Sequence, residues 1–185
     1  MAVVVILALL FAFALFVWWV WRESSFALPL DGRRSYASVK NETVASRQSV
    51  LFVCTHNSAR SQMAEALLRD MAGDGFHIAS AGTSPTSVHP LAEAAMAERG
   101  LTLRAHRAKR LDEVGTRWDY VVTLCDQAFE QCPDFSDKTS RLHWSIEDPS
   151  RPRETGAEQL EAFCRVADDL AVRLRRWVAE RLEKP

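Results

Sequence analysis

The chain has 185 residues, a formal net charge of −1 and a hydrophobic content of 48%. Its charge is close to neutral and no basic stripe with interleaved aromatic residues is present, so nucleic-acid binding is disfavoured. The spacing of its four cysteines and five histidines is not that of a zinc site, so no bound metal is expected.

The first 21 residues carry no charge and are almost entirely apolar. A segment of ~20 apolar residues can span a bilayer, and the tryptophans at its end, Trp18, Trp19 and Trp21, are typical of a membrane interface. The main alternative is a secretory signal, but the segment lacks a basic start and a clear small-residue cleavage site. Because basic residues follow it, we expect a single-pass helix in the inner (cytoplasmic) membrane with the rest of the chain in the cytoplasm. A mis-assigned start codon would instead make the protein simply cytoplasmic.

The remainder of the chain divides into a linker and one domain. Residues 22–48 are rich in serine and arginine without sustained periodicity, which predicts a flexible linker. Residues 49–185 form a domain of about 135 residues, a usual size for one hydrophobic core. Alternating patterns predict an α/β fold, an open parallel four-stranded sheet with helices on both faces. Strands are expected near 49–54, 77–81, 119–125 and 141–146, and helices near 61–72, 89–99 and 157–182.

A short loop from Cys54 to Arg60 joins the first expected strand to the first expected helix. Backbone N–H groups at such a turn, with the positive end of the helix dipole behind them, form a site for a phosphate-like anion. The same field favours the thiolate of a cysteine at the floor of the loop. Arg60 offers a planar fork of donors that can hold two oxygens of the anion in the transition state. Ser61 is expected to cap the helix.

The alternative is that a buried strand-end cysteine is followed by chance by a surface arginine. The strand, the Asn-Ser interior of the loop and Ser61 favour the catalytic interpretation. Further along the chain, Cys125 follows the third expected strand and Cys132 comes seven residues later, before Pro133. The set predicts a thiolate that attacks a tetrahedral oxyanion and is then oxidised by a neighbouring cysteine.

The stretch VLFVCTHNSARSQMAEALL resembles the active-site segment of the thioredoxin-coupled arsenate reductases, which share the fold of the low-molecular-weight protein tyrosine phosphatases. The segments ASAGTSP, VHPLAEAAMAERG, DYVVTLCDQAFEQCP and HWSIEDPSRP follow in the order and spacing of that family. The phosphatase branch usually carries two tyrosines directly after its Asp-Pro, whereas Asp148-Pro149 is followed here by Ser150 and Arg151. The resemblance therefore favours the reductase branch.

The resemblance implies that arsenate gains two electrons from a relay of three thiols and leaves as arsenite. Cys54 attacks the arsenate, Arg60 stabilises its charge and Asp148 acts as general acid. Cys125 then attacks the sulfur of Cys54 and releases arsenite. Cys132 takes over that bridge, which leaves a Cys125–Cys132 disulfide for thioredoxin or a related thiol reductant. No bound cofactor is implied, and a monomeric catalytic domain is expected.

The implied disulfide places a geometric demand on the segment between its two cysteines. If residues 126–131 are helical, a rise of ~1.5 Å per residue puts the Cα atoms of Cys125 and Cys132 roughly 10 Å apart. A disulfide tolerates only about 7 Å. The segment must therefore unwind during turnover, and we expect it to be more mobile than the sheet. Cys164, on the apolar face of the last helix, is expected to be a core residue.

The resemblance also implies roles for the rest of the loop. Asn57 is expected to stiffen the loop through side-chain hydrogen bonds, and Ser61 to lie near the Cys54 sulfur and favour its thiolate. No catalytic role is assigned to His56, and Asp148 has the alternative of a simple turn residue before proline. The residues expected to bind the oxyanion are Thr55, His56, Asn57, Ser58, Ala59, Arg60 and Ser61.

Some members of this family bind potassium beside the loop through an Asn, a Glu, a Ser and an Asp. Asn57, Glu65 and Ser80 match three of these positions, and Lys109 stands at the fourth. We therefore expect the lysine ammonium to replace the ion.

Two other functions remain open at this stage. The first is a phosphatase on the same fold, acting on phosphotyrosine or a small phosphoester. The second is a non-catalytic oxyanion-binding or redox-sensing module. An intact set of Cys54, Arg60 and Asp148 argues against the second, because a pure binding protein needs no general acid.

Overall fold

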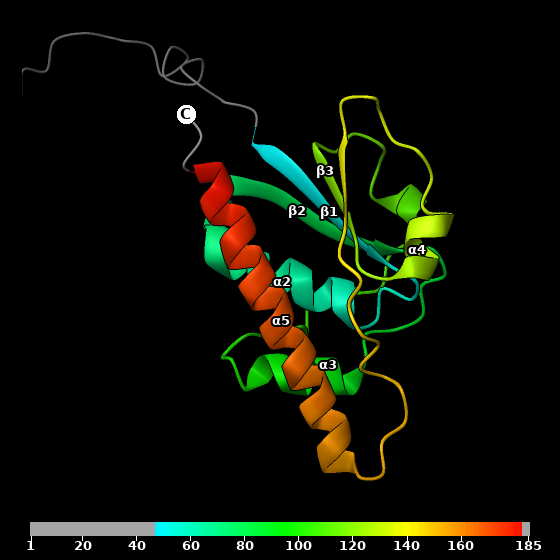
Figure 1. Ribbon diagram of the computed structural model, residues 1–185, viewed down its shortest axis with the longest axis vertical. Coiled ribbons are helices and arrows are strands. Elements are labelled where there is room, and N and C mark those ends of the chain that lie inside the picture. The colour runs from blue at the N-terminus through cyan, green and yellow to red at the C-terminus, as the bar shows by residue number, and fades with distance from the viewer. Residues whose placement is uncertain (1–46, 183–185) are drawn as a thin grey trace, which may run out of the picture. The chain divides into compact units, whose positions relative to one another are not determined.

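The computed structural model describes residues 47–182, and this part of the chain contains one four-stranded parallel sheet. Figure 1 labels its strands β1, β2 and β3. The order across the sheet is β2-β1-β3-β4, and every neighbouring pair is parallel. This confirms the predicted open parallel sheet. The strands are β1 (Gln48–Cys54), β2 (Phe76–Gly82), β3 (Tyr120–Thr123) and β4 (Ser140–His143).

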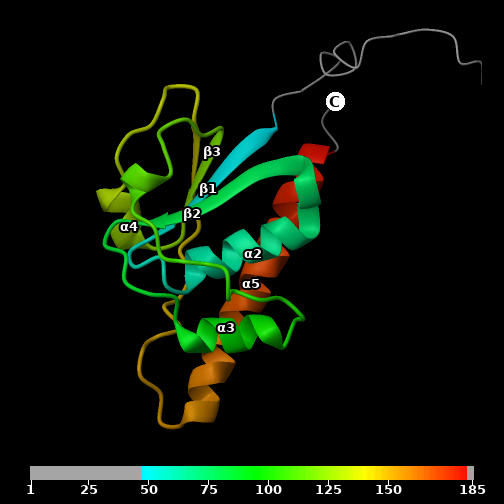
Figure 2. The same cartoon turned by 180° about the vertical axis from the view of Figure 1, so that it is seen from behind.

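The helices lie on both faces of this sheet, as predicted. Helix α2 connects β1 to β2, whereas α4 connects β3 to β4 in the opposite direction across the sheet. Right-handed crossovers in opposite directions place their helices on opposite faces, and both views agree (Figures 1 and 2). The helices are α2 (Arg60–Ala72), α3 (Pro90–Ala97), α4 (Asp126–Gln131) and α5 (Gly156–Leu182), with single 3₁₀ turns at Gly73–Gly75 and Leu111–Glu113.

Strand β1 is the centre of the core. Its residues 50–53 are at most 1% exposed, because the strand has a hydrogen-bonded neighbour on each side and helices above and below. Helix α5 packs against α2 and α3 through a stripe that includes Phe163, Leu170 and Leu174, all fully buried (Figure 2). The long periodic pattern near 157–182 is thus confirmed as a helix that covers one side of the domain.

The predicted N-terminal regions fall largely beyond this description. The predicted transmembrane segment, residues 1–21, and nearly all of the predicted linker, 22–48, lie outside the described residues. Within 47–182, none of the helices combines the length and the apolar character that crossing a bilayer requires.

Two strands are shorter than the sequence patterns suggest. Strand β4 ends at His143, although an extended segment up to 146 is predicted, and β3 ends at Thr123 rather than 125. Beyond these ends the chain still forms isolated hydrogen bonds, such as Leu124 N–H to the Val53 carbonyl at 2.8 Å. Beyond β4, the Ile146 carbonyl accepts a hydrogen bond from the Arg60 side chain instead of one from a neighbouring strand.

Candidate active site

The loop between β1 and α2 turns its carbonyl groups outward. The carbonyls of Cys54, Thr55, His56 and Ser58 accept hydrogen bonds of 2.8 to 3.3 Å from backbone N–H groups of residues 83–89. For the N–H groups of residues 55–59, no protein acceptor is found in the part of the chain that the structure describes. A loop whose carbonyls are satisfied on its outer side and whose N–H groups are not used by the protein is suited to bind an anion.

The loop lies directly against the end of β2, and Gly82 makes this possible. A Cβ atom on Gly82 would lie 2.8 Å from the Thr55 carbonyl oxygen and 2.9 Å from the Asn57 nitrogen. Any larger residue would push the loop away from the strand. Gly82 was not among the residues predicted from the sequence, although a glycine at the end of a strand pattern often marks a close backbone approach.

Cys54 and Ser61 meet beneath the loop. The Cys54 side chain is buried, and its Sγ lies 2.9 Å from Ser61 Oγ. Asn57 has a positive φ of 46° and donates through Nδ2 to Ser61 Oγ at 2.8 Å. Because the Ser61 oxygen already accepts this bond, its own hydrogen can be donated to the sulfur, which stabilises a thiolate. The expected position of Ser61 beside the sulfur is confirmed.

The expectation that Ser61 caps the helix is wrong. Helix α2 begins after Ala59, which makes no side-chain capping bond, and Ser61 is already inside the first turn. The Ser61 hydroxyl is committed to the loop and the sulfur instead.

Arg60 connects the loop to the segment that carries Asp148. Its guanidinium is nearly buried and donates through Nη1 to the Ile146 carbonyl and through Nη2 to Asp148 Oδ2, each at 3.2 Å. Burial alone would raise the pKa of Asp148, but two hydrogen bonds from Ser150 and the charges of Arg60 and His56 bring that pKa below the usual value. The carboxyl is therefore ionised at neutral pH in the anion-free state.

Cys125 lies beside the oxyanion loop. Strands β1 and β3 are neighbours, so the residues that follow them meet at one edge of the sheet. Cys125 is buried, and its Sγ lies 3.3 Å from Thr55 Oγ1. The same Thr55 hydroxyl also donates to Gln127 Oε1 at 3.2 Å. Neither of these contacts was predicted from the sequence, because they join residues about 70 positions apart.

Cys132 is held at the other end of a regular helix. Helix α4 spans the residues between the two thiols, and Cys132 N–H donates to the Ala128 carbonyl at 2.9 Å. The cysteines are free. Burial raises the pKa of Cys132. The negative charge of Asp134 raises this pKa further, whereas the positive charge of Arg141 lowers it in part. Residues 126–131 are helical, so the condition under which they must unwind to form the disulfide is confirmed. The higher mobility of this segment stays a prediction.

A cavity of about 320 Å³ opens above the loop. Cys125, Arg60 and Asp148 all contribute to its wall, as does His56. Three of the five predicted catalytic residues thus line the cavity, whereas Cys132 and the buried Cys54 are not among its lining residues. The full lining is Thr55, His56, Arg60, Cys125, Asp126, Gln127, Ser145, Ile146, Glu147, Asp148 and Arg151.

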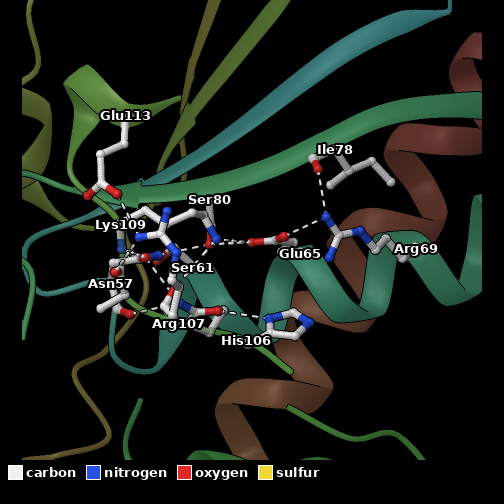
Figure 3. A network of polar contacts seen from close by, with 12 residues as sticks. Asn57, Ser61, Glu65, Arg69, Ile78, Ser80, His106, Arg107, Lys109 and Glu113 are labelled. Carbon is white, nitrogen blue, oxygen red and sulfur yellow. Dashed lines mark hydrogen bonds and ion pairs between the residues drawn. The ribbon is translucent and has the colours of Figure 1, made fainter. Parts of the chain in front are cut away.

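A buried polar network supports the loop from behind (Figure 3). Lys109 Nζ lies 3.3 Å from Glu65 Oε2, and Arg69 Nη2 lies 2.7 Å from Glu65 Oε1. Ser80 Oγ donates to the same carboxylate and accepts from Asn57 Nδ2 at 2.8 Å. Lys109 thus stands among the residues that match the potassium site. Residues 47–182 contain no cluster of three or more His, Cys, Asp or Glu side chains suited to a metal ion.

Gln62 also supports the oxyanion loop, and it was not predicted from the sequence. It is fully buried, and its Nε2 donates to the backbone and side-chain oxygens of Asn57 at 3.0 Å and to the Arg107 carbonyl at 2.9 Å. Its Oε1 lies 2.8 Å from His106 Nδ1, so that nitrogen carries a proton. Burial lowers the pKa of His106, which keeps the ring neutral. Apolar periodicity cannot reveal such a residue, because a buried glutamine looks like a surface position.

Known proteins are similar to the part of the chain that contains this site. A family model described as low molecular weight phosphotyrosine protein phosphatase matches residues 49–185. The arsenate reductase of Bacillus licheniformis is 34% identical over 133 residues, which are 71% of this chain and 96% of that protein.

Two solved structures are similar as well. A crystal structure of arsenate reductase from Archaeoglobus fulgidus has a TM-score of 0.57 and 32% identity, covering 70% of this chain and 98% of that one. A thioredoxin-dependent arsenate reductase of Corynebacterium glutamicum has a TM-score of 0.60 and 29% identity, covering 80% of this chain and 69% of that one. Both of these structures are named arsenate reductases, whereas the matching family model is named after phosphatases, which share the fold.

Proposed function

Because the chain belongs to the low molecular weight phosphotyrosine protein phosphatase family, we propose that it uses the cysteine loop of that fold to reduce arsenate to arsenite. The observation that carries this proposal is the position of Cys125. A phosphatase needs one thiolate and a water molecule, whereas here a second thiol lies 3.3 Å from the hydroxyl of Thr55, the residue that follows Cys54. The names of the similar proteins support the same function.

The first step is attack by Cys54 on arsenate. The loop N–H groups and Arg60 hold the oxygens of the anion, and the thiolate forms a sulfur–arsenic bond. One arsenic–oxygen bond breaks, and Asp148 delivers a proton to the departing oxygen. The bound anion draws the Arg60 guanidinium away from Asp148 and adds negative charge nearby. Both changes raise the proton affinity of the carboxyl when the proton is needed.

The next steps move two electrons. The Cys125 thiolate attacks Cys54 Sγ and forms a disulfide, and the electron pair of the sulfur–arsenic bond goes to arsenic, which leaves as arsenite. Cys132 then attacks Cys125 Sγ, and Cys54 departs as a thiolate ready for another cycle. Thioredoxin, or a related thiol reductant, reduces the Cys125–Cys132 disulfide.

The burial of Cys132 restricts when this thiol can take part in the reaction steps. In the resting enzyme its thiol is protonated and covered, since burial raises its pKa. Helix α4 must unwind before Cys132 reaches Cys125, because the helical spacing is too long for a disulfide. Unwinding therefore has to bring Cys132 out of its buried position before this thiol can attack the first disulfide.

This function is tested by arsenite production with thioredoxin, thioredoxin reductase and NADPH, using a chain that begins near Arg47. Steady arsenate-dependent oxidation of NADPH is expected. Hydrolysis of an aryl phosphate without any arsenate-dependent NADPH use would assign the protein to the phosphatase branch instead.

We further propose that residues 1–21 anchor this catalytic domain to the inner membrane, with the domain in the cytoplasm. The support is the uncharged apolar sequence and the basic residues after it. The full chain should stay in the membrane fraction after an alkaline wash, and a chain lacking residues 1–21 should not. Recovery of both in the soluble fraction would exclude the anchor.

Replacing Asp148 with asparagine should separate binding from chemistry. Asparagine cannot donate an acidic proton, so the rate of reduction should fall by about 10²-fold. Sulfate should nevertheless bind more tightly to Asp148→Asn than to the parent, because an ionised carboxyl next to the anion is removed. Single-turnover kinetics and sulfate inhibition measure the two effects. A parallel loss of rate and of sulfate affinity would mean that Asp148 only shapes the loop.

Lys109 should make the enzyme independent of potassium. Its ammonium already lies 3.3 Å from the Glu65 carboxylate, so replacing potassium chloride with choline chloride at constant ionic strength should leave kcat/KM unchanged. Lys109→Met should lower the free energy of unfolding by about 2 kcal/mol, because it removes one charged hydrogen bond from the buried Glu65 carboxylate, which keeps its pair with Arg69. Arg104→Met, which removes an exposed pair with Glu93, is the control and should have little effect. Strong activation of the parent by potassium would contradict this role.

A further inference from the structure

The wall of the oxyanion cavity contains two arginines, and only one of them is engaged by the protein. Arg60 is paired with Asp148. Arg151 is exposed, and its guanidinium forms no hydrogen bond or ion pair with another of residues 47–182. Arg151 therefore offers five unused donors and a full positive charge at this cavity.

None of the acidic side chains of the same wall is paired with Arg151, because each has another hydrogen-bond or ion-pair partner. Asp126 Oδ1 lies 3.0 Å from His143 Nε2, and Glu147 Oε1 lies 2.6 Å from Arg153 Nη2. Asp148, the remaining carboxylate, contacts Arg60 at 3.2 Å. The charge of Arg151 is thus left for a ligand.

The backbone that carries Arg151 is held in place from helix α5. Gln159 donates through Nε2 to the Pro149 carbonyl at 2.6 Å and to the Arg151 carbonyl at 3.1 Å, and its Oε1 accepts from Arg153 N–H at 3.1 Å. One side chain therefore fixes three backbone groups of the turn. Because the backbone of this turn is fixed, the Arg151 side chain loses less conformational entropy when it binds a ligand in the cavity.

We propose that Arg151 is a second oxyanion-binding residue and that it favours a free, doubly charged tetrahedral anion over an aryl ester. The proposal rests on the proposed function for the identity of the anion, but the binding chemistry is shared by arsenate and inorganic phosphate. A free anion keeps an outward oxygen that a second guanidinium can hold. In an ester that oxygen carries the organic group.

The composition of the cavity wall supports the same selectivity. Among its lining residues, His56 supplies the only ring and Ile146 the only aliphatic side chain. A phenyl group would therefore find little apolar surface against which to stack. Arg151, two residues after Pro149, stands in the segment where the phosphatase branch carries its tyrosines.

The test measures anion binding without relying on reduction. Inorganic phosphate that occupies the loop should protect Cys54 from alkylation by iodoacetamide, and mass spectrometry of the Cys54 peptide measures this for one thiol alone. Arg151→Ala should raise the phosphate concentration for half-protection about tenfold. Arg151→Lys should give a smaller increase, because it keeps the charge and loses the fork.

The matched control is Arg165→Ala, which removes the same charge from a surface pair with Glu161 on α5. It should leave protection within about twofold of the parent. Unchanged protection in Arg151→Ala, or an equal loss in Arg165→Ala, would overturn the proposal. This measurement does not depend on the proposed function, because phosphate can protect Cys54 whether or not the enzyme reduces arsenate. In a reducing enzyme, Arg151→Ala should also raise KM for arsenate by the same factor, with kcat little changed.

Discussion

Cys132→Ser should convert continuous arsenate reduction into at most one arsenite per protein molecule. Without the third thiol, the first turnover ends in a Cys54–Cys125 disulfide, and the nucleophile is not regenerated. Cys132 is buried at the end of α4 with its backbone in the helical hydrogen bond to Ala128. Serine keeps that bond and nearly the same volume, so the fold should survive.

The measurement is the yield of arsenite per enzyme in the coupled thioredoxin assay. The control is Cys164→Ser, which changes a half-buried thiol on α5 that donates to Glu98 and lies outside the cavity wall. This variant should turn over like the parent. Sustained turnover by Cys132→Ser would show that the reductant acts on Cys125 or Cys54 directly and that no three-thiol relay exists.

Arg60→Lys should lower kcat for arsenate reduction by about 10³-fold. Lysine keeps a positive charge but loses the planar fork, and it cannot hold the Ile146 carbonyl and the Asp148 carboxylate together as Arg60 does. In the variant, the loop therefore binds the anion with one fewer correctly oriented hydrogen-bond donor. The segment that carries the general acid also loses its anchor.

The control for Arg60 is another arginine of the same helix. Arg69 donates to the Ile78 carbonyl at 2.9 Å and pairs with Glu65, away from the cavity. Arg69→Lys should affect the stability of the fold and leave kcat within about threefold. Equal losses of kcat in the two variants would mean that Arg60 acts only through the packing of α2.

The central part of the site could be predicted from the sequence because its signals are local. Strand β1 is a continuous apolar run, and the loop and α2 follow it directly, so Cys54 and Arg60 were placed without any tertiary information. The position of Cys125 also followed from a local pattern, since it comes directly after an apolar strand. In parallel sheets such ends gather at one edge.

Contacts between distant segments could not be predicted in the same way. Gly82 is required because the Thr55 carbonyl lies against it, and Gln62 is buried because His106 and Asn57 satisfy its amide. A pattern of apolar residues along the chain contains neither fact. The capping role expected of Ser61 was wrong because α2 begins one residue earlier, whereas its position beside the Cys54 sulfur followed from the resemblance and is confirmed.

The most direct test of the three-thiol relay uses the reduced protein and arsenate with no added reductant. After rapid alkylation and peptide mapping, the account predicts one arsenite per protein molecule, an alkylated Cys54 and a disulfide between Cys125 and Cys132. Recovery of all three cysteines in alkylated form with no arsenite, or a final disulfide that still contains Cys54, would contradict it.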